Sequence, residues 1–139
     1  MAVTATPIFP QLIQSPVAQI LPADTTTLKT IVTAGADGTR VDRILVSYTD
    51  SGSRDLQFVI TSGGTDYILC TMTLPANSGN LAAVPPLSVF DHANMVGLLN
   101  DVNGNKVLFL GSGAVLKCKV TSSVAAAKII AFNVQLGNF

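Results

Sequence analysis

The side chains that could carry out chemistry are few and widely spaced. The 139 residues include one histidine, His92, two cysteines and no Glu or Trp. A nucleophile–His–acid triad would have to use His92, yet no glycine-flanked Ser follows a strand and opens a helix. Nothing selects one pair of Asp carboxylates for glycoside hydrolysis. We therefore expect a loop histidine, no catalytic residues and no enzymatic activity.

Metal and cofactor chemistry is equally poorly supported. The run from Asp101 to Asn105 superficially resembles a calcium loop, but its Gly comes two positions early and no Glu closes the site. Its Asn-Gly pair predicts a hairpin turn instead.

Cys70 and Cys118 occupy inward positions of alternating strands, so we expect buried free thiols. A disulfide between them remains an alternative, because the sequence does not show whether their Cβ atoms face each other. The glycine clusters lie between strands and predict turns, not phosphate loops. We expect no metal and no cofactor.

The composition favours an assembled subunit. Hydrophobic residues make up 48% of the chain, charged residues only 12%, and the formal net charge is zero. Ordinary domains carry about 25% charged residues, and a free protein near zero net charge tends to self-associate. Without clustered Lys and Arg, we expect no nucleic-acid binding. Without an 18-residue apolar run or a positive N-terminal region, we expect no membrane helix and no signal peptide.

The pattern from residue 25 onward predicts an all-β fold, an antiparallel, jelly-roll-like β-sandwich spanning 25–139. Turn residues recur about every 8–14 positions between stretches of alternating apolar and polar residues. One of these stretches places Ile68, Cys70, Met72 and Leu74 on its inward side. The predicted strands cover 25–34, 39–49, 54–61, 66–74, 107–110, 114–121 and 128–136. Residues 75–90 predict a long loop that could hold one edge strand, and Asp91 could cap a short helix through Met95 and Leu99.

Two predicted strands are apolar on both faces. Val107 to Leu110 has no polar side, and residues 129–132 are nearly the same. A sandwich strand with one solvated face should alternate. We therefore expect either the N-terminal segment or another subunit to cover the second face.

Residues 1–24 predict an extended N-terminal arm. Four prolines exclude a helix, and the first charged residue is Asp24. We favour an arm that lies on a neighbouring subunit, with an arm that wraps its own sandwich as the alternative, and we expect the sandwich to fold without residues 1–21. The predicted subunit-contact residues are Ile8, Phe9, Leu12, Ile13, Val17 and Ile20. Elsewhere, Lys117, Lys119 and Lys128 predict a solvated face or a basic patch that docks on an acidic neighbour.

Two segments and their turns carry a resemblance to a known group of proteins. They are Gly35-Ala-Asp-Gly-Thr-Arg-Val-Asp-Arg-Ile-Leu-Val-Ser-Tyr-Thr-Asp50 and Arg54-Asp-Leu-Gln-Phe-Val-Ile60, followed by Gly63-Gly64 and a strand ending near Leu74. The closing strand into Gly137-Asn138-Phe139 is also similar. Together they resemble the small β-sandwich virion proteins of tailed bacteriophages, especially capsid decoration (cement) proteins.

The resemblance implies a structural role in a virion assembled in a bacterial cytoplasm. Proteins of this kind often form homotrimers on the capsid lattice and clamp the major capsid protein, frequently with an extended arm. The same sandwich occurs in neck, tail, baseplate and fibre proteins. A receptor- or glycan-binding module that uses the loop from Pro75 to Phe90 is therefore an alternative, and a small hydrolase is the weakest one.

Overall fold

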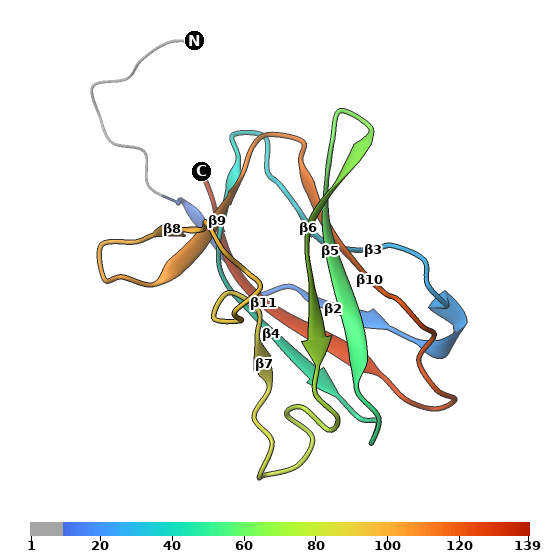
Figure 1. The fold of residues 1–139 in the computed structure, drawn as a ribbon. Helices are drawn as coiled ribbons and strands as arrows, with labels where there is room; N and C mark the ends of the chain where they lie inside the picture. The colour runs from blue at the N-terminus through green and yellow to red at the C-terminus, as the bar shows by residue number, and fades with distance from the viewer. Residues whose placement is uncertain (1–9) are drawn as a thin grey trace, which may run out of the picture.

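The computed structural model describes residues 10–139, which form the predicted all-β sandwich of two antiparallel sheets (Figure 1). We call the larger, seven-stranded sheet A and the four-stranded one sheet B. The one regular helix among residues 10–139 is a 3-10 turn at Pro22–Asp24. None of these residues belongs to a helix long and apolar enough to span a membrane.

Sheet A has the strand order β1-β11-β4-β9-β8, with β2 also on β11 and β7 on β4. Sheet B has the order β3-β10-β5-β6. The strands of sheet A are β1 (Leu12–Gln14), β2 (Val17–Ile20), β4 (Thr39–Tyr48), β7 (Leu87–Ser88), β8 (Leu99–Asn100), β9 (Lys106–Leu110) and β11 (Ile130–Asn138). Those of sheet B are β3 (Lys29–Thr33), β5 (Arg54–Ser62), β6 (Thr65–Leu74) and β10 (Val115–Val120).

The core lies between the two sheets and is built by the alternation in the sequence. In β10, Leu116, Cys118 and Val120 are buried, whereas the intervening lysines face outward on sheet B. Phe58 from sheet B and Phe132 from sheet A meet edge to face, with ring centroids 6.3 Å apart and planes at 86°. This contact joins the two layers at their centre.

Strand β6 departs from the predicted alternation. Phe58 pairs with Cys70, but the next residue, Val59, pairs with Ile68, so Leu69 is an extra residue in a β-bulge. The bulge moves Ile68 to the outer face of sheet B, where 68% of it is exposed. The prediction that Ile68 points inward with Cys70, Met72 and Leu74 was therefore wrong for Ile68.

The predicted helix after Asp91 was also wrong. Residues 91–98 form successive turns: the Met95 backbone N donates to the carbonyl of His92, and Gly97 has a φ of +79°. The Asn94 side chain donates to the Thr71 carbonyl at 2.8 Å instead of supporting a helix. Asn and Gly both favour such turns over helical backbone. The preceding loop contains one two-residue strand, β7, which pairs with β4.

The two cysteines are free thiols, as predicted, but only Cys118 is buried, and Cys70 is partly exposed. Cys118 pairs with Phe58 and Phe58 pairs with Cys70, so the two cysteines lie two strands apart in sheet B. That separation is about 10 Å, beyond the reach of a disulfide. Burial raises the pKa of both thiols, which keeps them protonated near neutral pH.

Candidate functional site

The N-terminal segment completes sheet A of its own chain. Strands β1 and β2 both pair antiparallel with β11. The Gln11 backbone N donates to the carbonyl of Asn138 at 2.7 Å, and the Val134 N donates to the carbonyl of Pro16 at 3.0 Å. For residues 10–20 the structure thus shows the alternative in which the segment packs on its own sandwich.

The predicted contact residues of this segment divide into three groups. Ile8 and Phe9 lie outside the described residues. Ile20 is completely buried in the core of its own chain. Leu12, Ile13 and Val17 are exposed, Ile13 to 81% and Val17 to 73%. Because β1 and β2 pair with β11 and Ile20 is part of the core, deletion of residues 1–21 would remove buried contacts from the sandwich; that it folds without them stays a prediction.

Ile13 belongs to a row of residues across the outer face of sheet A. Ile13 pairs with Gly137, Gly137 with Arg40, and Arg40 with Phe109. Paired residues point to the same face, and the neighbours of this row on β4 and β9, together with Leu136 on β11, are buried in the core. Phe109 is 49% exposed and stacks on Phe139. We call Ile13, Val17, Phe109 and Phe139 the apolar edge of this face; Leu12 pairs with Asn138 and points to the opposite face.

The two strands predicted to be apolar on both faces, 107–110 and 129–132, differ in how much of their outer side is buried. On the outer side of β9, Val107 is buried, whereas Phe109 remains half exposed. Ile129, just before β11, is 37% exposed, and Ile130, the first residue of β11, is buried. The second face is thus only partly covered within the chain, and Phe109 and Ile129 remain accessible to a partner.

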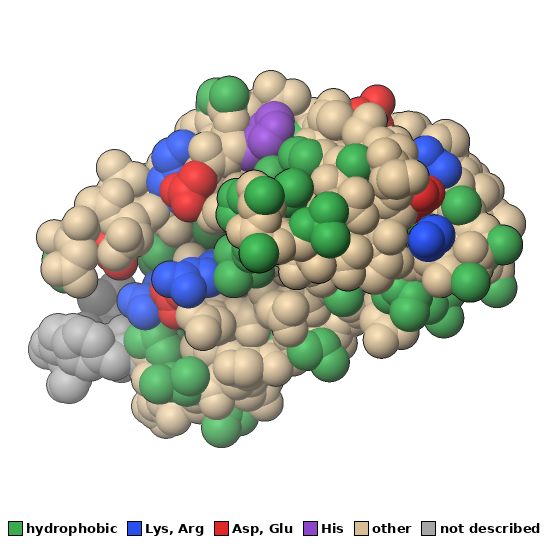
Figure 2. Space-filling model, turned by 90° about the horizontal axis from the view of Figure 1, so that it is seen from below, with side chains coloured by type: hydrophobic (Ala, Val, Ile, Leu, Met, Phe, Trp, Pro, Cys, Tyr) green, Lys and Arg blue, Asp and Glu red, His purple; other side chains and the backbone are tan. Residues whose placement is uncertain are grey.

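A polar cavity of about 380 Å³ lies next to the apolar edge, on the outer face of sheet A. Its charged lining residues come from β4, from β9 and from the two loops that flank them. These residues are Arg40, Asp42, Arg43, Asp91, Asp101 and Lys106. Figure 2 shows Lys, Arg and Asp side chains gathered around a hollow toward one end of the molecule, with hydrophobic side chains beside them.

The three acidic residues of the cavity are already engaged. Asp42 Oδ1 lies 2.8 Å from Arg40 Nε, an ion-pair contact without hydrogen-bond geometry at that nitrogen. Asp91 accepts a 2.6 Å hydrogen bond from Ser88 Oγ. Asp101 accepts from the backbone N of Asn105 at 2.9 Å and of Asn103 at 2.8 Å, and these bonds lower the pKa of its carboxyl. The last pair confirms that residues 101–105 are a hairpin turn between β8 and β9.

No local pattern in the sequence predicts this cavity. The one available signal was Arg40, Asp42 and Arg43, three charged residues within four positions of a chain with 12% charged residues. The convergence of β4, β9 and two loops depends on long-range pairing, which local patterns do not show.

The residues considered for catalysis do not come together. His92 Nδ1 accepts a hydrogen bond from the backbone N of Asn94 at 3.1 Å, while Ser88 pairs with Asp91. Within residues 10–139, no group of three or more His, Cys or Asp side chains is placed to hold a metal ion. Of the lysines considered for a basic patch, Lys117 and Lys119 share the outer face of sheet B, and Lys128 lies in the loop before β11.

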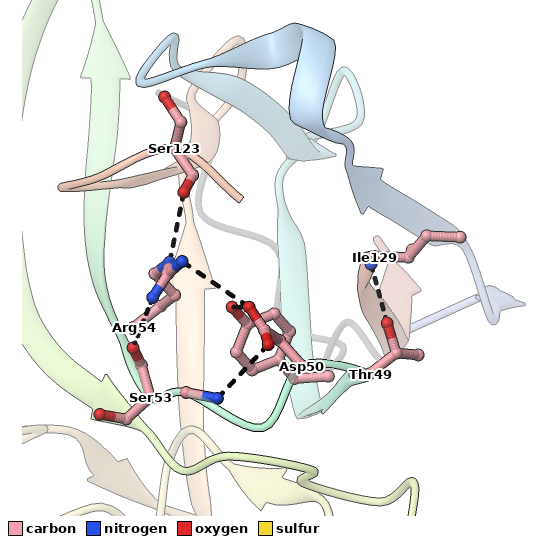
Figure 3. Close-up of polar contacts among 8 residues, drawn as sticks. Thr49, Asp50, Ser53, Arg54, Ser123 and Ile129 are labelled. Atoms are coloured by element: carbon pink, nitrogen blue, oxygen red, sulfur yellow. Dashed lines mark hydrogen bonds and ion pairs between the residues drawn. The ribbon is translucent and has the colours of Figure 1, made fainter. Parts of the chain in front are cut away.

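A second polar cluster connects two turns by hydrogen bonds at the opposite end of β4 (Figure 3). The Tyr48 hydroxyl donates to Asp50 Oδ2 at 3.1 Å, and Arg54 Nη2 lies 3.7 Å from the same oxygen. Arg54 also donates to the carbonyls of Ser53 and Ser123. All of its partners belong to the chain itself, so this cluster holds the fold together.

Comparisons with known proteins give no assignment. No protein-family model and no curated protein match the chain. Among solved structures, the chain is similar to the extra small virus (XSV) VLP of the giant freshwater prawn Macrobrachium rosenbergii. The two chains share 12% identity and a TM-score of 0.32 over 99% of this chain and 87% of the other. Because both values are low, this likeness does not constrain what the chain does.

Proposed function

We propose that this chain is a viral structural protein, a capsid decoration (cement) subunit that attaches through the outer face of sheet A. The observation that carries the proposal is the exposure of Ile13 and Val17, to 81% and 73%, on two strands held in place by β11. Fully burying such a side chain contributes about 1.5–3 kcal/mol. Repeated over many copies, this burial stabilises a lattice.

The rigidity of the apolar edge supports a binding role. Ladder pairing with β11 fixes β1 and β2 before any partner arrives, so little conformational entropy is lost on binding. Within residues 10–23 there is no charged side chain to keep the segment in solvent. Exposed apolar residues on one face of a sheet can serve as an interaction surface.

The finer parts of the proposal come from the resemblance to phage virion proteins. They are attachment to the major capsid protein, association as a homotrimer, and a place on the outside of the head. Location on a neck, tail, baseplate or fibre is the alternative, and the same apolar edge would serve there.

Two experiments test this function. Quantitative mass spectrometry of purified virions should find hundreds of copies per particle, whereas a few copies would place the protein in a neck or tail. Heads stripped of the protein should bind the wild type but not the Ile13→Asp/Val17→Asp variant. Ile68→Asp is the matched control because Ile68 is 68% exposed on the outer face of sheet B, away from the apolar edge. Equal binding by wild type and double variant would contradict the proposal.

A further inference from the structure

We propose that the cavity on the outer face of sheet A is a socket for a carboxylate side chain, Asp or Glu, presented by a partner protein. The inference rests on the proposed function only in that this partner is the surface to which the chain attaches. The cavity volume of about 380 Å³ lies within the range of known ligand pockets.

Two basic side chains of the cavity, Arg43 and Lys106, have no ion-pair partner within residues 10–139. The three carboxylates of the cavity are occupied by Arg40, by Ser88 and by backbone amides of the β8–β9 turn. The lining has equal numbers of acidic and basic side chains, but each carboxylate already accepts a hydrogen bond or forms an ion pair, whereas these two cations have no ion-pair partner in the described part of the chain.

These two cations suit a carboxylate. A guanidinium presents two parallel N–H groups that match the two oxygens of a carboxylate, and an ammonium adds further donors. Both cations come from neighbouring strands, Arg43 from β4 and Lys106 from β9. This pair of side chains favours a planar anion such as a carboxylate.

The surroundings favour a protein as the source of that carboxylate. Arg40, at the cavity wall, stands in the same cross-strand row as Ile13 and Phe109. A partner that covers the apolar edge would also extend over the cavity. Such a partner would present apolar side chains around one acidic residue, and complementary charge at this point would fix its register.

NMR titration of the full chain tests the socket. The probes are the peptide Ac-Phe-Glu-Leu-NH₂ and its neutral counterpart Ac-Phe-Gln-Leu-NH₂, with glucuronate and glucose as sugar probes. We expect the Glu peptide to shift the amide signals of residues 88–91 and 104–107 in a saturable way. The Gln peptide should bind about tenfold more weakly, since a charge-assisted hydrogen bond is lost.

Variants show whether the two cations are responsible. Arg43→Gln and Lys106→Gln should each weaken binding of the Glu peptide about tenfold. Lys117→Gln, on the outer face of sheet B, should leave the affinity unchanged, and dispersed spectra establish that all three variants fold. Equal affinity for the Glu and Gln peptides, an equal loss in Lys117→Gln, or tighter binding of glucuronate than of the peptide would each overturn the proposal.

The outcome is separable from that of the proposed function. If the peptide does not bind while the protein still decorates heads, only the socket is wrong. If the peptide binds as expected but virions contain only a few copies, the decoration role is wrong and the socket stands.

Discussion

Pro10 lies directly over Gly137, so closely that a Cβ added to Gly137 would come within 2.5 Å of the Cβ of Pro10. Gly137 occupies the outer side of β11, and its lack of a side chain lets the N-terminal segment cross the sheet before it enters β1. The contact therefore determines where the segment joins its own sandwich.

Substitution Gly137→Ala should displace Pro10 and weaken the first residues of β1. Overpacking of this kind costs about 1–3 kcal/mol. Hydrogen exchange should show faster exchange of the Gln11 amide, which is bonded to the Asn138 carbonyl. Gly111→Ala is the control, because a Cβ there meets no atom within 4 Å. Unchanged protection of the Gln11 amide in Gly137→Ala would show that Pro10 does not depend on this contact.

Ile20 should contribute to stability, and Val17 should not. Ile20 is fully buried and pairs with Ile130, so Ile20→Ala should lower the free energy of unfolding by about 2–5 kcal/mol. Val17 is 73% exposed, and Val17→Ala should change it by less than about 0.5 kcal/mol. Urea unfolding measures both values. Equal, small effects would mean that β2 does not belong to the folded core.

The Tyr48–Asp50 pair should make stability depend on alkaline pH. Burial and the hydrogen bond to Asp50 raise the pKa of Tyr48 from 10.0 to about 12. Because the unfolded chain loses this proton first, the stabilisation is fully present below pH 10 and is lost as the pH rises toward 12. Urea unfolding between pH 9 and 12 should therefore show a steeper decline for the wild type than for Tyr48→Phe, in which every other titrating group is retained. Parallel declines would contradict this.

The Tyr48–Asp50 pair should also make the free energy of unfolding depend on pH in acid, through the carboxyl of Asp50. Although burial opposes it, hydrogen bonds from Tyr48, Gly52 and Ser51 lower the pKa of Asp50 below 3.8. Stabilisation by this carboxylate is present above that value and is lost as the pH falls through the pKa of the folded state. In Tyr48→Phe the pKa of Asp50, followed by NMR of its side-chain carbonyl, should rise toward 3.8. An unchanged pKa would mean that the Tyr48 hydroxyl does not stabilise the carboxylate.

Local patterns in the sequence were sufficient to predict the sandwich and most of its strands. Alternation identified the buried side of β4 and β10, and glycine pairs marked the turns. The bulge at Leu69 could not be predicted, because one extra residue changes which side chains point inward without altering composition. Local patterns do not predict the pairing of β1 with β11 or the convergence of Arg40, Asp91 and Lys106, because both bring together residues that are far apart in sequence.

The most direct test of an assembly role is the sedimentation velocity of the purified protein across a range of concentrations. The account predicts that the wild type and the control Ile68→Asp sediment as oligomers, and that Ile13→Asp/Val17→Asp sediments as a folded monomer of 14.4 kDa. A wild type that stays monomeric at every concentration, or a double variant that assembles as well as the control, would contradict it.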